Sequence, residues 1–335
     1  MRFAPTAEQL DLQGVVRELL DELSPPAVVR AAPDSPEVAR LSLGLADLGA
    51  YGLLVPEHAG GLGLDENVLV GLLTETGYAA APLPTIDTVG FAAGLLDATG
   101  LATRVMTGTT AVVADPAVSG QARYGTRAGL VLQGGFAGAG PIRVLDLAGA
   151  TREPVPAVDP AADLHRFAGA TVVAVVDDPA VVETAWQRGV LGAAAELVGL
   201  ARRMIAMTVG HVSSRTQFGV PIGSFQAVKH HLASALLAVE FAAPTVARAG
   251  AALADGDADR ARAVATAKAL SSDAATQVAR ATIQCHGALA YTTEYDLHLY
   301  AKRAWALAAD WGSAAWHRAR VAEDLGLTAG PAPAA

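Results

Sequence analysis

The stretch "SSRTQFGVPIGSFQAVKHHLA", residues Ser213–Ala233, lies between two long segments rich in alanine, leucine and valine that each predict a helix. Gly219 and Pro221 favour a bend between these helices, because neither residue suits a helix interior. Arg215 can present a planar guanidinium group to a phosphate, and backbone N–H groups at a bend can bind an anion. These residues alone allow two interpretations, an anion-binding joint or a helix–helix turn with a solvated arginine.

Two other residue types in the joint suit a nucleotide. The Gln217 amide can donate to a phosphate or to an adenine edge, and the ring of Phe218 or Phe225 can stack on a base. The pattern Arg-x-x-Phe-Gly is short and can occur by chance, so evidence from other parts of the chain is needed to choose between the two interpretations.

Composition narrows the class of protein. A chain of 335 residues is long enough for two or three domains, and its 52% hydrophobic content suggests that another subunit covers part of its surface. A net charge of −9 without a basic stripe argues against a nucleic-acid partner. The single Cys285 excludes an internal disulfide and favours a reducing, cytoplasmic location. We expect no signal peptide and no membrane partner, because the apolar run Val190–Ala201 is too short to span a bilayer.

The predicted order of elements is helices, then strands, then helices. Thr6 and Ser35 are suitable N-caps, and helices are expected near residues 7–23, 36–48, 65–80 and 85–98. Short Val/Leu runs after Thr109, "TTAVVADP", "GLVLQGG", "IRVLDLAG" and "ATVVAVVDD", predict strands. We therefore expect a helical domain at 1–108, a small β domain at 109–178, a helical bundle at 179–326 and a flexible tail at 327–335.

The joint also matches a known signature. "RTQFGVPIGSFQAVKHHLA" resembles the C-terminal pattern R-x-x-F-G-x-x-I-x-x-F-Q of the acyl-CoA dehydrogenases. Other parts of the chain resemble the same family in the same order: "LADLGAYGLLVPEHAGGLGLD", "TETGYAAAPLP", "AELVGLARRMI" and "QCHGALAYTTEYDLHLYAKRA". The resemblance implies a mainly α fold with a small β domain: N-terminal helices, a middle β domain and a C-terminal four-helix bundle.

The resemblance also implies a cofactor, FAD, held between subunits. The flavin ring lies in the pocket of one subunit, while the neighbour's arginine and glutamine segments hold the pyrophosphate and adenosine. By this resemblance the residues for the second role are Arg215, Gln217, Phe218, Phe225, Gln226, Gln284 and Gly287.

Several positions depart from the family pattern. The late glycine-rich motif is reduced to Gly287 followed by Ala-Leu-Ala, which makes a close backbone approach to phosphate harder. Val112–Gly125 takes the place of the loop that contacts the flavin edge, without that loop's serine and threonine pattern. The middle domain is also short for the family.

The catalytic base is the largest departure. Family chemistry removes an α-proton with a glutamate while the β-hydrogen leaves as hydride to the flavin. The common glutamate position, about seventeen residues after Glu294, is Trp311, and the alternative position is Gly189. Asp310, beside Trp311, is a substitute candidate for the base, although it or Ser313 also suits a helix cap. Glu183 and Glu196 are further candidates that we expect instead to face solvent and to make a bundle contact, respectively.

The sequence thus resembles the short subunits of heteromeric acyl-CoA dehydrogenases of actinobacterial steroid side-chain catabolism. We expect an α2β2 hetero-oligomer in which a full-length partner supplies flavin and base and the complex forms an enoyl-CoA. Three alternatives stay open: a self-sufficient homo-oligomer using a base such as Asp310, a flavin oxidase or monooxygenase of the same fold, and a scaffold without FAD contact. The histidines, including His230, His231 and His286, lack metal-ligand spacing, so we expect no metal site.

Overall fold

The computed structural model describes residues 5–327. The N-terminal segment of the chain is helical. Thr6 forms a capping box with Gln9, and Ser35 accepts a hydrogen bond from the first turn of its helix, so these two predicted caps are confirmed. Asp65, which was predicted as the first residue of its helix, is instead its N-cap. The helices are α1 (Ala7–Leu23), α2 (Pro26–Val29), α3 (Pro36–Asp47), α4 (Glu66–Ala79), α5 (Ala93–Thr99) and α6 (Ala102–Met106).

The prediction of one continuous α-helix at 85–98 was wrong. Ile86–Phe91 is a π-helix, and α5 follows it as a separate helix. Ala92 N donates to Asp87 O at 2.9 Å, a bond that spans five residues and holds the wider turn. All six residues of the π-helix are buried against α7 and β1, so tertiary packing rather than local propensity sets this geometry.

Two small sheets follow. The four predicted runs are confirmed as one sheet in the order β1-β3-β4-β7, with β1 parallel to β3 and the other pairs antiparallel. A second sheet, β2-β6-β5, was not predicted, because its strands are short and carry no apolar run. The strands are β1 (Ala111–Asp115), β2 (Gln121–Ala122), β3 (Ala128–Gly134), β4 (Ile142–Asp146), β5 (Thr151–Pro154), β6 (His165–Ala168) and β7 (Thr171–Val176).

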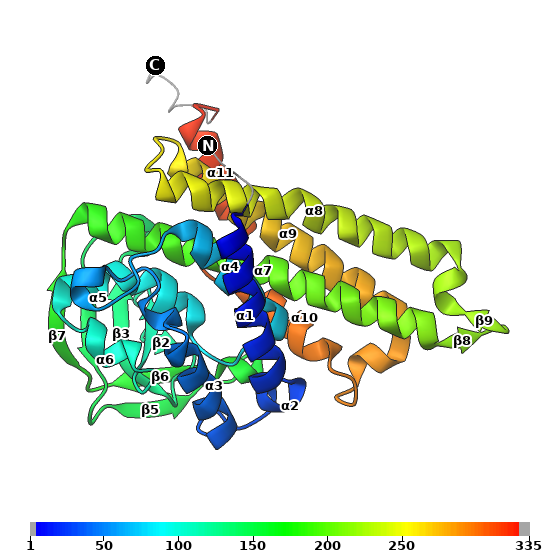
Figure 1. Cartoon of the computed structure of the whole chain (residues 1–335), viewed down its shortest axis with the longest axis horizontal. Helices are drawn as coiled ribbons and strands as arrows, with labels where there is room; N and C mark the ends of the chain where they lie inside the picture. The colour runs from blue at the N-terminus through cyan, green and yellow to red at the C-terminus, as the bar shows by residue number, and fades with distance from the viewer. Residues whose placement is uncertain (1–4, 328–335) are drawn as a thin grey trace, which may run out of the picture.

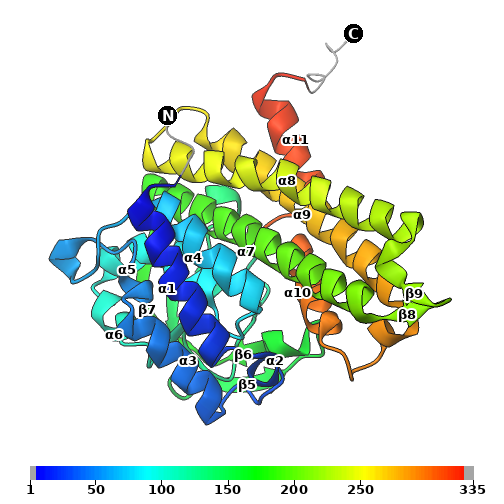
Figure 2. The same cartoon turned by 45° about the vertical axis from the view of Figure 1, so that its right-hand side comes forward.

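The C-terminal part is a bundle built around one long helix. Its elements are α7 (Pro179–Ser214), the hairpin strands β8 (Thr216–Gln217) and β9 (Val220–Pro221), α8 (Gln226–Ala254), α9 (Arg260–His286), α10 (Leu297–Ala309) and α11 (Ala314–Asp324). Figure 1 shows α7, α8 and α9 side by side, with the β8–β9 hairpin projecting beyond their ends, and Figure 2 shows the same projection after a turn of the molecule.

Helix α7 also crosses α4 at close range. A Cβ atom on Gly77 would lie 2.3 Å from Glu196 O, and one on Gly199 would lie 2.0 Å from Thr74 O. The crossing therefore requires glycine on both helices. It anchors the N-terminal helices to the bundle, and the resulting core runs through helices and strands of all three predicted domains. The domain limits 1–108, 109–178 and 179–326 stay predictions, and the predicted tail lies outside the described residues apart from Leu327.

Helix α8 is the one described helix long and apolar enough to cross a membrane by length and composition alone. We expected no membrane partner because the apolar run Val190–Ala201 is short, but α8 lies outside that run. Core helices of water-soluble proteins pass the same test, and α8 packs along α9, so the finding is weak support for a span.

A buried arginine joins the three parts of the chain. Arg303, on α10, forms an ion pair with Asp159 between β5 and β6, and its Nη1 donates to Ala81 O after α4 at 3.1 Å. Both charged side chains are 3% exposed. Removing one partner of such a pair leaves an uncompensated buried charge, so the pair constrains the packing of the three parts.

We expect Arg303→Met to lower the free energy of unfolding by about 3–5 kcal/mol, because Asp159 would remain buried without its partner. Denaturant unfolding measures this change. The matched control is Arg318→Met, whose pair with Asp273 is more than half exposed on both sides and should contribute less than about 1 kcal/mol. Equal losses in the two variants would contradict the assignment.

Candidate functional site

The joint after α7 folds as a tight hairpin. Strands β8 and β9 pair through Thr216–Pro221 and Gln217–Val220, and Phe218 and Gly219 form the turn with φ values of 54° and 81°. Two-residue hairpin turns of this kind need positive φ at both positions, which is uncommon for a phenylalanine. The turn therefore holds Phe218 at the tip, where it is 93% exposed.

The other predicted residues of the joint face outward as well. Arg215 and Gln217 are exposed, and Arg215 makes no ion pair with any carboxylate of residues 5–327. The Phe218 and Phe225 rings meet edge to face, with centroids 6.2 Å apart. Helix α8 begins at Gln226 without a side-chain cap, so its first N–H groups are available to an anion.

The end of α9 lies against this joint. His286 stacks on His211 of α7 with ring centroids 4.3 Å apart, and Tyr295 packs on His286 at 4.8 Å. Burial lowers the pKa of both histidines, which keeps the stacked rings neutral. The stack brings exposed Gln284 and Gly287 to the same end of the bundle as Arg215. The segments that carry Arg215 and Gln284 were predicted from the sequence, whereas the stacked histidine pair between them was not.

The two family positions for the catalytic base meet in space. A Cβ atom on Gly189 would lie 2.3 Å from Cζ3 of Trp311, so the indole occupies the space that a side chain at Gly189 would need. Trp311 also contacts Phe91 and Trp186, with ring centroids 5.2 Å and 5.6 Å away. An aromatic cluster thus fills the space beside Gly189.

Hydrogen bonds from two buried side chains hold the turn that carries Trp311. Trp311 has a φ of 57°, and His317 Nε2 lies 2.8 Å from its carbonyl oxygen. The buried Lys268 Nζ donates to Gly312 O at 3.0 Å and to Ala308 O at 3.2 Å. Burial lowers the pKa of Lys268 to about 7 and that of His317 to about 4. These bonds fix a backbone that tryptophan rarely adopts.

None of the three substitute bases is free of other contacts. Asp310 ends α10 and forms an ion pair with Arg123 Nη1 at 3.0 Å, while Ser313 caps α11. Glu183 is half-exposed and accepts from Gln187 Nε2 at 2.8 Å. Asp310 and Glu183 are thus held by neighbouring side chains.

Glu196 does not make the expected bundle contact. It is buried and accepts hydrogen bonds from Thr85 at 2.7 Å and Thr76 at 3.2 Å, both in the N-terminal segment. Burial raises the pKa of its carboxyl group. The α4–α7 crossing turns this face of α7 toward the N-terminal helices, which explains the difference from the expectation.

Asp87 is a buried charge and Arg123 is a partly buried one with 15% of its side chain exposed, and neither was predicted from the sequence. Burial raises the pKa of Asp87 to about 6, and its carboxylate accepts from Ala114 N at 3.0 Å and lies 4.0 Å from Arg123 Nη2. The two residues line a cavity of about 300 Å³ together with Asp310, Trp186 and Trp311. No local pattern marks Asp87, since it lies in the unpredicted π-helix.

The segment Val112–Gly125 forms one wall of this cavity. Asp115 accepts from Ser119 N at 2.8 Å and Gly120 N at 2.9 Å, which folds the loop back on itself. Arg123 then enters between Asp87 and Asp310. The place of the expected flavin-edge contacts therefore holds a paired guanidinium group. Within residues 5–327 no group of three or more histidine, cysteine, aspartate or glutamate residues could hold a metal ion.

Comparison with known proteins gives consistent matches. The family model described as "Acyl-CoA dehydrogenase, C-terminal domain" matches residues 180–326. "Acyl-CoA dehydrogenase IpdE2" of Mycobacterium tuberculosis is 32% identical over 317 residues, covering 90% of this chain and 92% of that protein.

Solved structures share the fold. One is the ChsE4-ChsE5 complex from Mycobacterium tuberculosis, with a TM-score of 0.82, 22% identity and coverage of 98% of this chain and 100% of that one. Another is the "Tcur3481-Tcur3483 steroid ACAD G363A variant", with a TM-score of 0.81, 24% identity and coverage of 95% and 98%. The expected fold class, mainly α with a small β region, is confirmed.

A double-mutant cycle tests the contact between the two base positions. Gly189→Ala should lower stability by about 1–3 kcal/mol, because the new Cβ overlaps the indole. In a Trp311→Ala background the same substitution should be neutral or stabilising, since alanine favours a helix by about 0.5–1 kcal/mol. Denaturant unfolding of the four proteins gives the coupling.

The control is Gly210→Ala, on the same helix, where a Cβ atom meets nothing within 4 Å. It should be stabilising in both backgrounds. A Gly189→Ala cost that persists without the indole would show that Trp311 does not occupy this space.

His317 should make stability depend on pH. Its pKa is about 4 in the folded chain against 6.5 ordinarily, so the unfolded chain binds more protons between these values. Stability should therefore fall by up to about 3 kcal/mol as the pH falls from 6.5 to 4. His317→Gln should flatten this fall, whereas the exposed His231→Gln should leave it unchanged. Unfolding midpoints measured at several pH values give the comparison, and identical profiles would refute the assignment.

Proposed function

Because the chain belongs to the acyl-CoA dehydrogenase family, we propose that it is the non-catalytic subunit of an FAD-dependent complex that oxidises an acyl-CoA thioester to the α,β-enoyl-CoA. FAD, the cofactor of the family, accepts the β-hydrogen in this chemistry. Under this proposal the chain lends contacts to an FAD whose ring and catalytic base belong to a full-length partner.

The observation that carries the proposal is the contact of Trp311 with Gly189. Tryptophan and glycine cannot accept a proton at these positions, and the contact leaves no space between them for an acyl chain. The neighbouring cavity holds Arg123 paired with Asp87 and Asp310. This half of the chain does not fit a flavin ring with a base beside it.

The exposed end of the bundle does fit the other half of FAD. Arg215 and the uncapped start of α8 offer positive charge and N–H groups suited to a pyrophosphate. The exposed Phe218 offers a face for adenine, and Gln284 offers an amide. In the complex these side chains would bind and orient the nucleotide, with no proton to transfer.

A hetero-oligomeric partner is supported by the neighbours in structure. Two of the structural relatives pair two different proteins, ChsE4 with ChsE5 and Tcur3481 with Tcur3483, and the second pair is a steroid ACAD variant. We propose an α2β2 assembly in the cytoplasm with a steroid-derived or related acyl-CoA as substrate.

A self-sufficient enzyme is the second candidate, favoured by one observation. Asp87 has a pKa of about 6 and lines the cavity beside Trp311, so it has the proton affinity of a general base. The same carboxylate, however, lies beside the Arg123 guanidinium and is 2% exposed, and Asp310 is held by that guanidinium as well.

Expression with and without the partner tests the proposal. We expect the lone chain to bind less than about a tenth of an equivalent of FAD, and the complex to bind FAD and form enoyl-CoA. Flavin absorbance and product formation are the measurements. Stoichiometric FAD and turnover in the lone chain would overturn the proposal and favour the second candidate.

Variants of the hairpin test the proposed contact between this chain and the FAD of its partner. Arg215→Ala and Phe218→Ala should each weaken FAD binding by the complex about tenfold or more, because each removes a charge-assisted or stacking contact. Titration of flavin into the apo-complex measures the dissociation constant. The matched control is Arg202→Ala, which changes an exposed arginine on α7, the helix before the hairpin, and should have no effect. Unchanged affinity in the hairpin variants would instead support a scaffold without FAD contact.

A further inference from the structure

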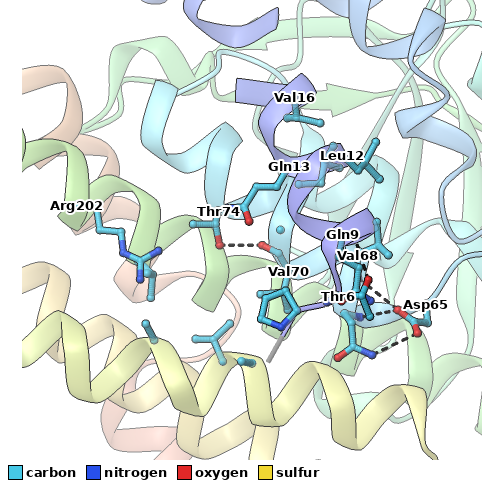
Figure 3. Close-up of a pocket in the computed structure, with 18 residues that line it drawn as sticks. Thr6, Gln9, Leu12, Gln13, Val16, Asp65, Val68, Val70, Thr74 and Arg202 are labelled. Atoms are coloured by element: carbon cyan, nitrogen blue, oxygen red, sulfur yellow. Dashed lines mark hydrogen bonds between the residues drawn. The ribbon is translucent and has the colours of Figure 1, made fainter. Parts of the chain in front are cut away.

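A second hollow lies between the N-terminal helices and the bundle. It is bordered by α1, α4, α7 and α8, and its volume is about 380 Å³ (Figure 3). We refer to it as the α1–α8 pocket. It shares no lining residue with the Arg123 cavity, and its size lies within the range of pockets that take small organic molecules.

The pocket follows from the way in which three helices meet. Helix α8 packs on α4 at Gly250, where an added Cβ atom would lie 3.2 Å from Glu66 O. Helix α1 packs on α4 near Gly71, where an added Cβ atom would lie 3.8 Å from Cβ of Gln13. Helices α1 and α8 do not pack on each other to a comparable extent, so the angle between them stays open.

The walls of the pocket are aliphatic. Its lining includes Leu12 and Val16 of α1, Val68 of α4, Val198 of α7 and Val246 of α8, and no aromatic ring lies among the lining residues of the described chain. Leu12 and Val68 are only partly buried, so apolar surface remains accessible here. Removing such surface from water favours a ligand with an aliphatic body.

Several polar groups of the lining are already bonded within the protein. Thr74 Oγ1 donates to Val70 O at 2.7 Å, and Gln13 Nε2 donates to Glu75 at 2.6 Å. Asp65 accepts hydrogen bonds from the first turn of α4 as its N-cap. These groups serve the fold, so they are less suited to fixing a charged ligand.

Arg202 differs from these groups. It is the one cationic side chain among the described residues that line the pocket, and it is exposed, so a ligand can reach it. It makes no ion pair, side-chain hydrogen bond or ring contact within residues 5–327, a property that it shares with Arg215. Figure 3 shows Arg202 at one end of the pocket and Asp65 at the other.

We propose that the α1–α8 pocket binds a small aliphatic carboxylate, whose body lies on the apolar walls and whose carboxylate pairs with Arg202. A carboxylate can accept two parallel hydrogen bonds from a guanidinium group. Asp65 at the far end disfavours a second negative charge on the ligand, so the pocket fits a monocarboxylate. The site uses no residue of the hairpin and does not depend on FAD.

Isothermal titration calorimetry of the full chain, or of the complex if the chain is obtained only with its partner, tests the site. The probes are cyclohexylbutanoate, cyclohexylbutanol and cyclohexylbutylammonium, which share one aliphatic body. We expect the carboxylate to bind saturably, about tenfold or more tightly than the alcohol, and the ammonium to bind more weakly than the alcohol. Equal binding of carboxylate and alcohol, or no saturable binding of the carboxylate, would overturn the proposal.

A variant of the arginine tests the charge contact. Arg202→Met should weaken carboxylate binding about tenfold and leave alcohol binding unchanged, because it removes the cation and keeps an apolar side chain. The matched control is Arg280→Met, which changes an exposed arginine on α9 and should alter neither affinity. A preference for the carboxylate that survives in Arg202→Met would refute the role of Arg202.

A variant of the wall tests whether the ligand lies in the pocket itself. Leu12→Asn should weaken the binding of carboxylate and alcohol alike, by about fivefold or more, because it removes apolar surface and leaves Arg202 in place. The matched control is Leu10→Asn, on the same helix, where the leucine is 54% exposed and lies outside the pocket. Equal effects of the two variants would place the ligand elsewhere and overturn the proposal.

Discussion

The contact between the Trp311 indole and the bare backbone of Gly189 governs how the rest of this molecule is arranged. It requires glycine in the middle of the central helix α7 and a positive φ at Trp311, where a tryptophan is strained. Lys268 and His317 hold the turn, at the cost of burying one group whose pKa falls to about 7 and another whose pKa falls to about 4. The Trp311 side chain also lines the charged cavity at Arg123.

The chain has a closed end at the Arg123 cavity, which does not fit a flavin ring, and an open end at the hairpin, where we propose contacts to the FAD of the partner. At the closed end, the polar groups satisfy one another: Arg123 pairs with Asp87 and Asp310, and Asp115 folds its own loop. At the open end, Arg215 and Phe218 remain exposed on a rigid hairpin. A surface that holds outward an arginine with no ion pair among residues 5–327, and a phenylalanine that is 93% exposed, is suited to a ligand or a neighbouring subunit rather than to the fold.

Much of the fold could be predicted because local rules agree with tertiary packing. The N-caps at Thr6 and Ser35 and four apolar runs predicted helices and strands that the structure confirms. The π-helix Ile86–Phe91 and the sheet β2-β6-β5 could not be predicted, because they depend on burial between distant elements rather than on periodicity. The Arg303–Asp159 pair escaped for the same reason, since its partners are separated by more than a hundred residues.

The sequence by itself determined the order of the elements, the bend at Gly219 and the residue types carried by the hairpin, because each of these is a matter of residue type and local spacing. Only the tertiary structure decided that Trp311 and Gly189 touch and that Arg123 enters between two carboxylates. These are properties of side chains brought together across the chain, where burial sets both the available space and the proton affinity.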